Sequence, residues 1–225
     1  MRPLLRRLLK LEVVGLERVP EGPCIVAANH RSNLDPPVLN AVFREPLYFL
    51  AKEELFKPPL GWVMRHLRTL PVSKRAGDVK VLEETVKLLK GGCKVGIFPE
   101  GKRAPAGTFL KPKPGVGLLA VKSGFPVLPV LIEGTDLILP KGALLPRPGP
   151  SVRVVVGEPV SYAGLPERVR VFKEVAQDIM ERIKALSSLQ GQEVEVNSPR
   201  SRLPEDACHL AGGGAGGENV VKDQH

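Results

Sequence analysis

The chain has 225 residues, of which 43% are hydrophobic, and it carries a formal net charge of +9. This length and apolar content suffice for one sizeable core, so we expect a single domain. The three cysteines lie outside metal-ligand spacing, the four histidines are dispersed, and no glycine-rich nucleotide fingerprint is present. The sequence therefore predicts neither a metal nor an organic cofactor.

The positive charge is concentrated in the first half of the chain. Residues 1–122 hold 22 Lys and Arg against 11 Asp and Glu, whereas residues 123–225 hold 11 against 13. A basic surface attracts phosphate, nucleic acid or an acidic membrane face, or serves solubility alone. Nucleic-acid binding needs aromatic side chains for base stacking, and aromatics make up only 4% of the chain. We therefore expect no nucleic-acid partner.

The N-terminus shows a membrane-related pattern without a spanning segment. No stretch reaches the ~20 consecutive apolar residues that a spanning helix needs, and the start lacks the apolar run of a secretory signal. We therefore expect a protein that stays inside the cell, on the cytoplasmic side of the cell membrane. Residues 1–10 interleave leucines with basic residues at helical spacing, which predicts either a short anchor at an anionic membrane or an ordinary packing helix.

Apolar runs of strand length alternate with helical patterns along the chain. One apolar face recurs up to Lys90, where two glycines follow, and a longer one runs from beyond Pro166 to Leu186, which predicts two helices. This alternation predicts an α/β fold, a single layered domain with a mixed, mostly buried sheet covered by helices on both faces. Strands are predicted over residues 24–28, 48–51, 94–98, 127–132 and 152–156.

The pattern ends near Ser187, and residues 212–217 are almost all glycine. We therefore divide the chain into a basic segment over residues 1–10, a domain over residues 11–188 and a disordered tail over residues 189–225.

The first segment that could carry catalytic chemistry is NHRSNLDP, residues 29–36, directly after a predicted strand. His30 and Asp35 can meet if the chain turns there, and the carboxylate then orients the imidazole and stabilises its protonated form. This spacing predicts a general base with its orienting group. The alternative is a surface histidine near an aspartate that caps a helix.

Three further segments surround predicted strand ends. FPEGKR, residues 98–103, opens a loop that has four cations and no anion from Lys102 to Lys113, so it could clamp a phosphate or simply be solvated. Lys74 and Arg75 follow a short strand and precede a helix N-terminus, which also attracts anions. FPVLPV, residues 125–130, predicts a buried strand.

Together and in this order, the four segments resemble the 1-acylglycerol-3-phosphate acyltransferase family of the glycerolipid acyltransferase superfamily. The resemblance extends from about Leu11 to Gly157. It implies that His30 is the catalytic base, that Asp35 is its partner, and that Arg103 contacts the phosphate of the acceptor.

The remaining positions implied to bind substrate are Glu100, Gly101, Lys102, Lys74 and Arg75. Lys102 stands where the family usually has threonine. Lys74 falls on the arginine position of another block, and Arg75 follows it, so which of the two contacts the phosphate stays open. The chain begins close to the domain, so we expect the longer N-terminal membrane segments of some relatives to be absent.

The resemblance implies transfer of an acyl group from acyl-CoA or acyl carrier protein to 1-acylglycerol 3-phosphate (lysophosphatidic acid), which gives phosphatidic acid. A neutral His30 would remove the proton of the acceptor hydroxyl, so no serine or cysteine nucleophile is needed. Two alternatives stay open. One is another acceptor, such as glycerol 3-phosphate or a different lysolipid, and the other is a non-catalytic basic protein that binds membranes.

Overall fold

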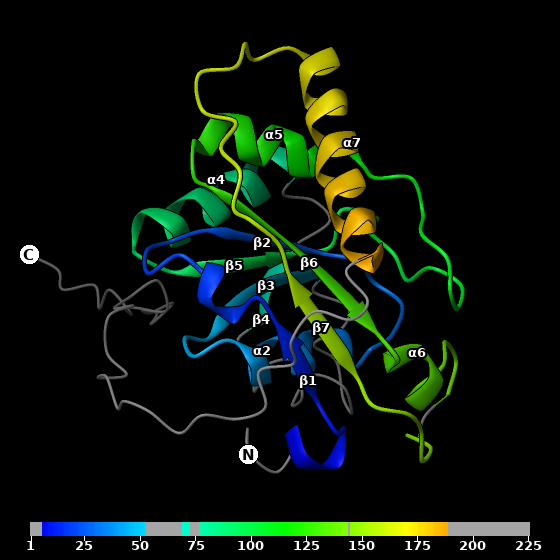
Figure 1. Cartoon of the computed structure of the whole chain (residues 1–225). Helices are drawn as coiled ribbons and strands as arrows, with labels where there is room; N and C mark the ends of the chain where they lie inside the picture. Colours follow the sequence, from blue (N-terminus) through cyan, green and yellow to red (C-terminus); the bar gives the residue numbers. More distant parts are fainter. Residues whose placement is uncertain (1–5, 53–68, 73–76, 144, 189–225) are drawn as a thin grey trace, which may run out of the picture.

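The computed structural model describes residues 6–52, 69–72, 77–143 and 145–188 (Figure 1). Its strands are β1 (Glu12–Val14), β2 (Ile25–Ala28), β3 (Leu47–Lys52), β4 (Thr69–Val72), β5 (Lys94–Ile97), β6 (Val127–Glu133) and β7 (Arg153–Val156). Its helices are α2 (Asp35–Val42), α4 (Gly77–Lys90), α5 (Pro114–Ser123), α6 (Thr135–Ile138) and α7 (Val169–Ala185), with 3-10 turns η1 (Leu16–Arg18) and η4 (Leu186–Ser188). The predicted disordered tail lies outside this described part, as do Lys74 and Arg75.

The strands form one mixed sheet of seven strands in the order β1-β7-β6-β2-β5-β3-β4. All neighbouring pairs are parallel except β6 and β7, which are antiparallel. The predicted mixed sheet is thereby confirmed.

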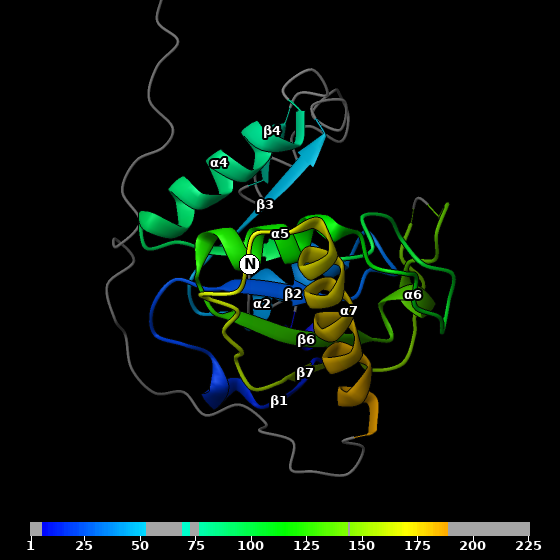
Figure 2. The same ribbon diagram turned by 90° about the horizontal axis from the view of Figure 1, so that it is seen from above.

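Helices lie on both faces of this sheet, as predicted. Helices α4, α5 and α7 cover one face and α2 lies on the other (Figures 1 and 2). In the central strand β2, Ile25 and Ala27 pack into the first core, whereas Val26 and Ala28 pack into the second. A strand with no exposed face has a continuous apolar sequence, which is why the apolar run predicts β2.

The sequence predicts the longer elements but not β1, α2 and α5. The five predicted strands match β2, β3, β5, β6 and β7, and the two predicted helices match α4 and α7. Strand β1 has only three residues, too few for a period. Helices α2 and α5 each carry a proline in the first turn, where its missing N–H costs nothing, and α5 is apolar over most of its surface.

The register places three strand ends together. Ile25 pairs with Val95 and with Val127, so the parallel strands β2, β5 and β6 end at the same edge of the sheet. We call this the carboxyl edge, and it is defined by Ala28, Ile97 and Glu133. Loops at such an edge are where open α/β sheets place their ligand sites.

In the described part of the chain, no helix has the length and apolarity to cross a membrane.

Candidate active site

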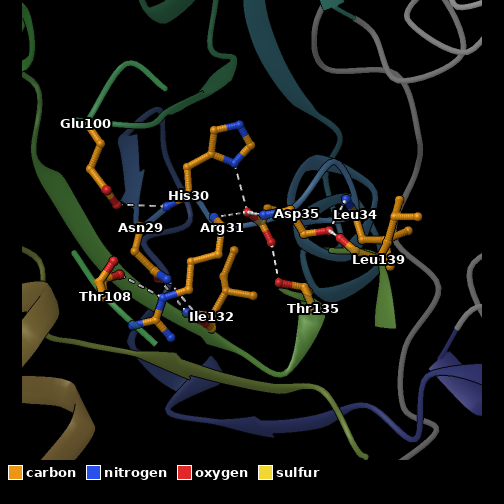
Figure 3. A network of polar contacts seen from close by, with 11 residues as sticks. Asn29, His30, Arg31, Leu34, Asp35, Glu100, Thr108, Ile132, Thr135 and Leu139 are labelled. Atoms are coloured by element: carbon orange, nitrogen blue, oxygen red, sulfur yellow. Dashed lines mark hydrogen bonds and ion pairs between the residues drawn. The ribbon is translucent and has the colours of Figure 1, made fainter. Parts of the chain in front are cut away.

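The histidine and aspartate predicted to act together meet at the carboxyl edge. His30 follows the end of β2 by two residues, and Asp35 is the first residue of α2. The tight turn between these elements brings His30 Nδ1 to 2.8 Å from Asp35 Oδ2 (Figure 3). This distance is that of a charge-assisted hydrogen bond.

Four donors fix the Asp35 carboxylate, which is only 1% exposed. Besides His30, the backbone N–H groups of Arg31 and Ser32 donate to Oδ2 at 2.7 and 2.8 Å, and the Thr135 hydroxyl donates to Oδ1 at 2.6 Å. A carboxylate can only accept, so His30 Nδ1 carries the hydrogen of this bond. In the neutral imidazole, this hydrogen on Nδ1 leaves a lone pair on His30 Nε2, the form that a general base needs.

The imidazole is held on its flat side by an aromatic ring. Phe98 stacks on His30 with ring centroids 4.1 Å apart and an interplanar angle of 18°, and Phe49 lies behind Phe98 at 5.7 Å. The His30 side chain is 18% exposed, and its Nε2 has no hydrogen-bond partner among the described residues. The ring is thus fixed in orientation while its reactive nitrogen stays open.

Asn29 joins the turn after β2 to the neighbouring strand β6. Its Nδ2 donates to the carbonyl of Ile132 at 2.9 Å, and the N–H of Ile132 donates to Asn29 Oδ1 at 2.7 Å. The Ser32 hydroxyl donates to the carbonyl of Leu139 at 2.7 Å, beyond α6. These bonds hold Thr135 in reach of Asp35.

Glu100 holds the basic loop to the turn that carries His30. Its Oε1 accepts the N–H of His30 at 3.0 Å and its Oε2 accepts the N–H of Leu110 at 2.8 Å. Burial raises the pKa of the Glu100 carboxyl above its ordinary value, and the two backbone donors partly oppose this. The carboxylate therefore connects the two ends of the loop instead of pairing with Arg103.

Arg31 secures the outer part of the same loop. Its Nε donates to the carbonyl of Thr108 at 3.0 Å, and its guanidinium lies 4.6 Å from the centroid of the Phe109 ring. This residue, like Thr135, was not among the predicted site residues. A threonine just beyond a strand that ends at the same edge was the available signal for Thr135, whereas the stacking of Arg31 on Phe109 has no sequence signature.

The residues predicted to bind phosphate differ from one another in conformation and exposure. Gly101 has a φ of +65°, a left-handed backbone conformation that favours glycine. Lys102 is exposed, and Arg103 is half-buried. Within the described residues, Arg103 makes no ion pair or hydrogen bond, so its guanidinium is available to an anion. Lys74 and Arg75 lie outside the described part.

Among the described residues around the site, no set of metal ligands is present. Across the described ranges, no three His, Cys, Asp or Glu side chains are grouped so that they could hold an ion.

Comparison with known proteins identifies the family of this chain. A protein-family model described as "Acyltransferase" matches residues 10–133. A 1-acyl-sn-glycerol-3-phosphate acyltransferase of Pseudomonas aeruginosa is 31% identical over 172 residues, which are 75% of this chain and 65% of that protein. A chloroplastic enzyme of the same name from Brassica napus is 32% identical over 156 residues, which are 67% of this chain and 45% of that protein.

A solved structure shares the fold. The crystal structure of the 1-acyl-sn-glycerophosphate (LPA) acyltransferase from Thermotoga maritima matches with a TM-score of 0.66 and 32% identity, over 85% of this chain and 80% of that one. The chain thus spans between about half and two thirds of the length of the two relatives above. The family predicted from the four segments is confirmed: the chain belongs to the acyltransferase family, to which the 1-acylglycerol-3-phosphate acyltransferases also belong.

Proposed function

We propose that this chain transfers an acyl group from acyl-CoA or acyl carrier protein to the free hydroxyl of 1-acylglycerol 3-phosphate and so forms phosphatidic acid. The observation that carries the proposal is the 2.8 Å bond from His30 Nδ1 to an Asp35 carboxylate that is otherwise saturated with donors. The names of relatives at 31–32% identity support the choice of acceptor.

In this reaction His30 Nε2 takes the proton of the acceptor hydroxyl as its oxygen attacks the thioester carbonyl carbon. The tetrahedral intermediate then collapses, the carbon–sulfur bond breaks, and the departing thiolate receives the proton from the imidazolium. Asp35 stabilises the imidazolium between these two steps. A positioned base of this kind contributes about 10²–10⁴ in rate.

Ser32 beside the site, and Cys24 at the opposite end of β2, both support direct transfer without an acyl-enzyme. The Ser32 hydroxyl donates to Leu139 and accepts the N–H of Leu34, so it is engaged in holding the turn. Cys24 is fully buried, and burial raises the pKa of its thiol to about 11, which keeps it protonated at neutral pH.

Arg103 is our candidate for recognition of the acceptor's phosphate. Its guanidinium is half-buried and has no partner among the described residues, whereas Lys102 beside it is exposed and adds positive charge. Glu100 and Gly101 act on this contact through the shape of the loop. Strand β4 ends at Val72, at the carboxyl edge, and Lys74 and Arg75 follow it by two and three residues, so one of them would assist.

A bilayer-bound acceptor calls for peripheral contact with an anionic membrane on its cytoplasmic side, and we assign part of this contact to residues 1–10. Of these, residues 6–10 are described, and Arg7, Leu8 and Lys10 are exposed while Leu9 is buried in the core. Insertion of leucines into the bilayer interface and attraction of cations to anionic headgroups are the two contributions that bind such segments to a membrane.

The direct test measures thiol release and product mass with purified protein. Acyl-CoA and acylated carrier protein are each combined with lysophosphatidic acid, with glycerol 3-phosphate and with a lysolipid that lacks a phosphate. The proposal expects phosphatidic acid as the main product with at least one donor. A product only from glycerol 3-phosphate, or no product with any pair, would refute it.

A further inference from the structure

Three large apolar side chains are left exposed around the site. Leu8, Leu137 and Leu145 are 69%, 56% and 77% exposed. Leu137 lies in α6, the helix whose first residue, Thr135, binds Asp35. The N–H of Arg147 donates to the carbonyl of Ile138 at 2.8 Å, so the loop after α6 folds back and brings Leu145 near Leu137.

The N-terminal segment reaches the same edge of the sheet. Strand β7 is antiparallel to β6, and Arg153 pairs with Glu133, so β7 starts where β6 ends. The N–H of Val152 donates to the carbonyl of Leu9 at 3.0 Å, which places Leu8 beside that start. Figure 1 shows the dark blue N-terminal turn and α6 at the same end of the sheet.

The exposed charges in residues 6–10 and 134–150 are all positive, whereas the nearby Glu12 and Glu133 are partly buried and Glu133 pairs with Arg153. Residues 134–150 contain Lys141 and Arg147, both exposed, and one acidic residue, Asp136. Asp136 is buried and its Oδ2 accepts the N–H of Gly107 at 3.2 Å, so it faces the basic loop. Arg7 and Lys10 add two exposed cations at the N-terminal segment. Apolar side chains ringed by cations match an anionic lipid surface.

We infer that these residues form one surface that docks on an anionic bilayer with the carboxyl edge facing the lipid. We call it the leucine surface, and it consists of Arg7, Leu8, Lys10, Leu137, Lys141, Leu145 and Arg147. The inference rests on the proposed function for its orientation, because an acceptor held in a bilayer must reach His30. It extends membrane contact beyond residues 1–10 to a loop more than 120 residues away in the sequence, which the Ser32–Leu139 and Thr135–Asp35 bonds fix to the site.

The test compares Leu137→Ser/Leu145→Ser with a matched variant at the opposite edge. Leu165 and Val169 are also exposed, but they follow Val160, which bridges Val127 at the start of β6. Both variants and the wild-type chain are sedimented with vesicles of phosphatidylglycerol and phosphatidylcholine. The leucine variant is expected to bind about ten-fold more weakly or worse, and Leu165→Ser/Val169→Ser to bind like the wild type.

Equal binding by the leucine variant and the wild type would overturn the inference, as would equal losses in both variants. If the leucine variant instead abolishes a dimer in analytical ultracentrifugation and leaves vesicle binding unchanged, a second copy covers the surface and the inference is wrong. Melting temperatures check that each variant folds.

Activity separates this inference from the proposed function. Each protein is assayed with lysophosphatidic acid in vesicles and with a short-chain, monomeric form. The ratio of vesicle to monomer activity should fall about ten-fold in the leucine variant. A wild-type chain that binds vesicles through the leucines but forms no phosphatidic acid from either acceptor would refute the proposed function and leave the docking surface standing.

Discussion

At the scale of single residues, the Asp35 carboxylate connects its own helix α2 with the turn after β2 and with α6. Its donors come from the turn after β2 and from α6, a hundred residues later in the sequence. Because it is buried and every donor points at it, its charge is stabilised locally and is directed at His30. The orientation of the imidazole is therefore a property of the folded sheet edge and not of the NHRSNLDP segment alone.

Arg103 provides a test of phosphate recognition. Replacing it with lysine keeps the charge but loses the planar fork, and replacing it with alanine loses both. A lost charge-assisted contact of about 1.5–3 kcal/mol corresponds to roughly a 10- to 150-fold fall in kcat/KM. We expect this fall with lysophosphatidic acid for Arg103→Ala and a substantial part of it for Arg103→Lys.

The control uses a lysolipid without the phosphate and the exposed neighbour Lys102→Ala. Arg103→Ala should leave activity on the neutral lysolipid nearly unchanged, and Lys102→Ala should have a much smaller effect on both acceptors. An equal loss on both acceptors in Arg103→Ala would mean that the arginine shapes the loop and does not read the phosphate.

Glu100→Gln should show the opposite pattern. The amide nitrogen must face the N–H of His30 or of Leu110, which leaves one buried donor unpaired at a cost of about 1–3 kcal/mol. Relief of the buried charge offsets part of this cost. We expect a lower melting temperature and a similar loss of activity on every acceptor, because the loop is displaced. A loss confined to phosphorylated acceptors would contradict this role.

The pH dependence of the same variant has a defined sign. The pKa of Glu100 is raised in the folded chain, so the folded state binds its proton more tightly than the unfolded state. The wild-type chain should therefore gain stability relative to Glu100→Gln as the pH falls from neutral through this raised pKa. Denaturant melts at several pH values measure the free energy of unfolding of both proteins. If the stability of the wild-type chain relative to Glu100→Gln falls as the pH falls, the pKa of Glu100 is not raised in the folded chain.

At the scale of elements, α5 and α7 approach each other closely at one glycine. A Cβ at Gly117 would lie 2.0 Å from the carbonyl oxygen of Phe172, a backbone atom that cannot move aside alone. Gly117→Ala should therefore destabilise the fold by about 1–3 kcal/mol or more, seen as a melting temperature lower by roughly 2–12 °C.

Gly115, two positions earlier in α5, is the matched control. A Cβ there meets nothing within 4 Å, so Gly115→Ala should be neutral or stabilise by up to about 1 kcal/mol. If the two variants melt alike, α5 and α7 do not pack in this way.

The sequence predicted the elements and the pairs of residues that lie close in the chain. Strand β2 and residues 127–132 of β6 are apolar because both faces are buried, and His30 and Asp35 are only five residues apart. The contacts of Asn29 with Ile132 and of Asp35 with Thr135 depend on which strands become neighbours. That order is set by packing of the whole sheet, and no local pattern records it.

Glu100 shows a second kind of limit. Its place beside Arg103 made it a candidate for substrate binding, but residue type alone does not reveal which donors a carboxylate meets. In the fold its two oxygens reach the N–H groups of His30 and Leu110, so its effect on any substrate runs through the loop.

At the scale of the whole molecule, the positive charge of the first half and the leucine surface would both contribute to the proposed contact with an anionic membrane. If the proposed membrane contact combines both terms, binding to anionic vesicles should weaken as salt rises from about 0.05 to 0.5 M, because screening removes the electrostatic part. A remaining, salt-resistant fraction would report the leucines. Binding that is as strong to neutral vesicles as to anionic ones at low salt would contradict the role of the basic residues.

The role of His30 as the base for acyl transfer is tested by the rate of phosphatidic acid formation by His30→Ala. The wild-type chain should form the product from a thioester donor and lysophosphatidic acid. The variant should fold with an unchanged melting temperature and should turn over about 10²–10⁴ times more slowly. A folded His30→Ala variant whose turnover stays within a few-fold of the wild type would show that His30 is not the base.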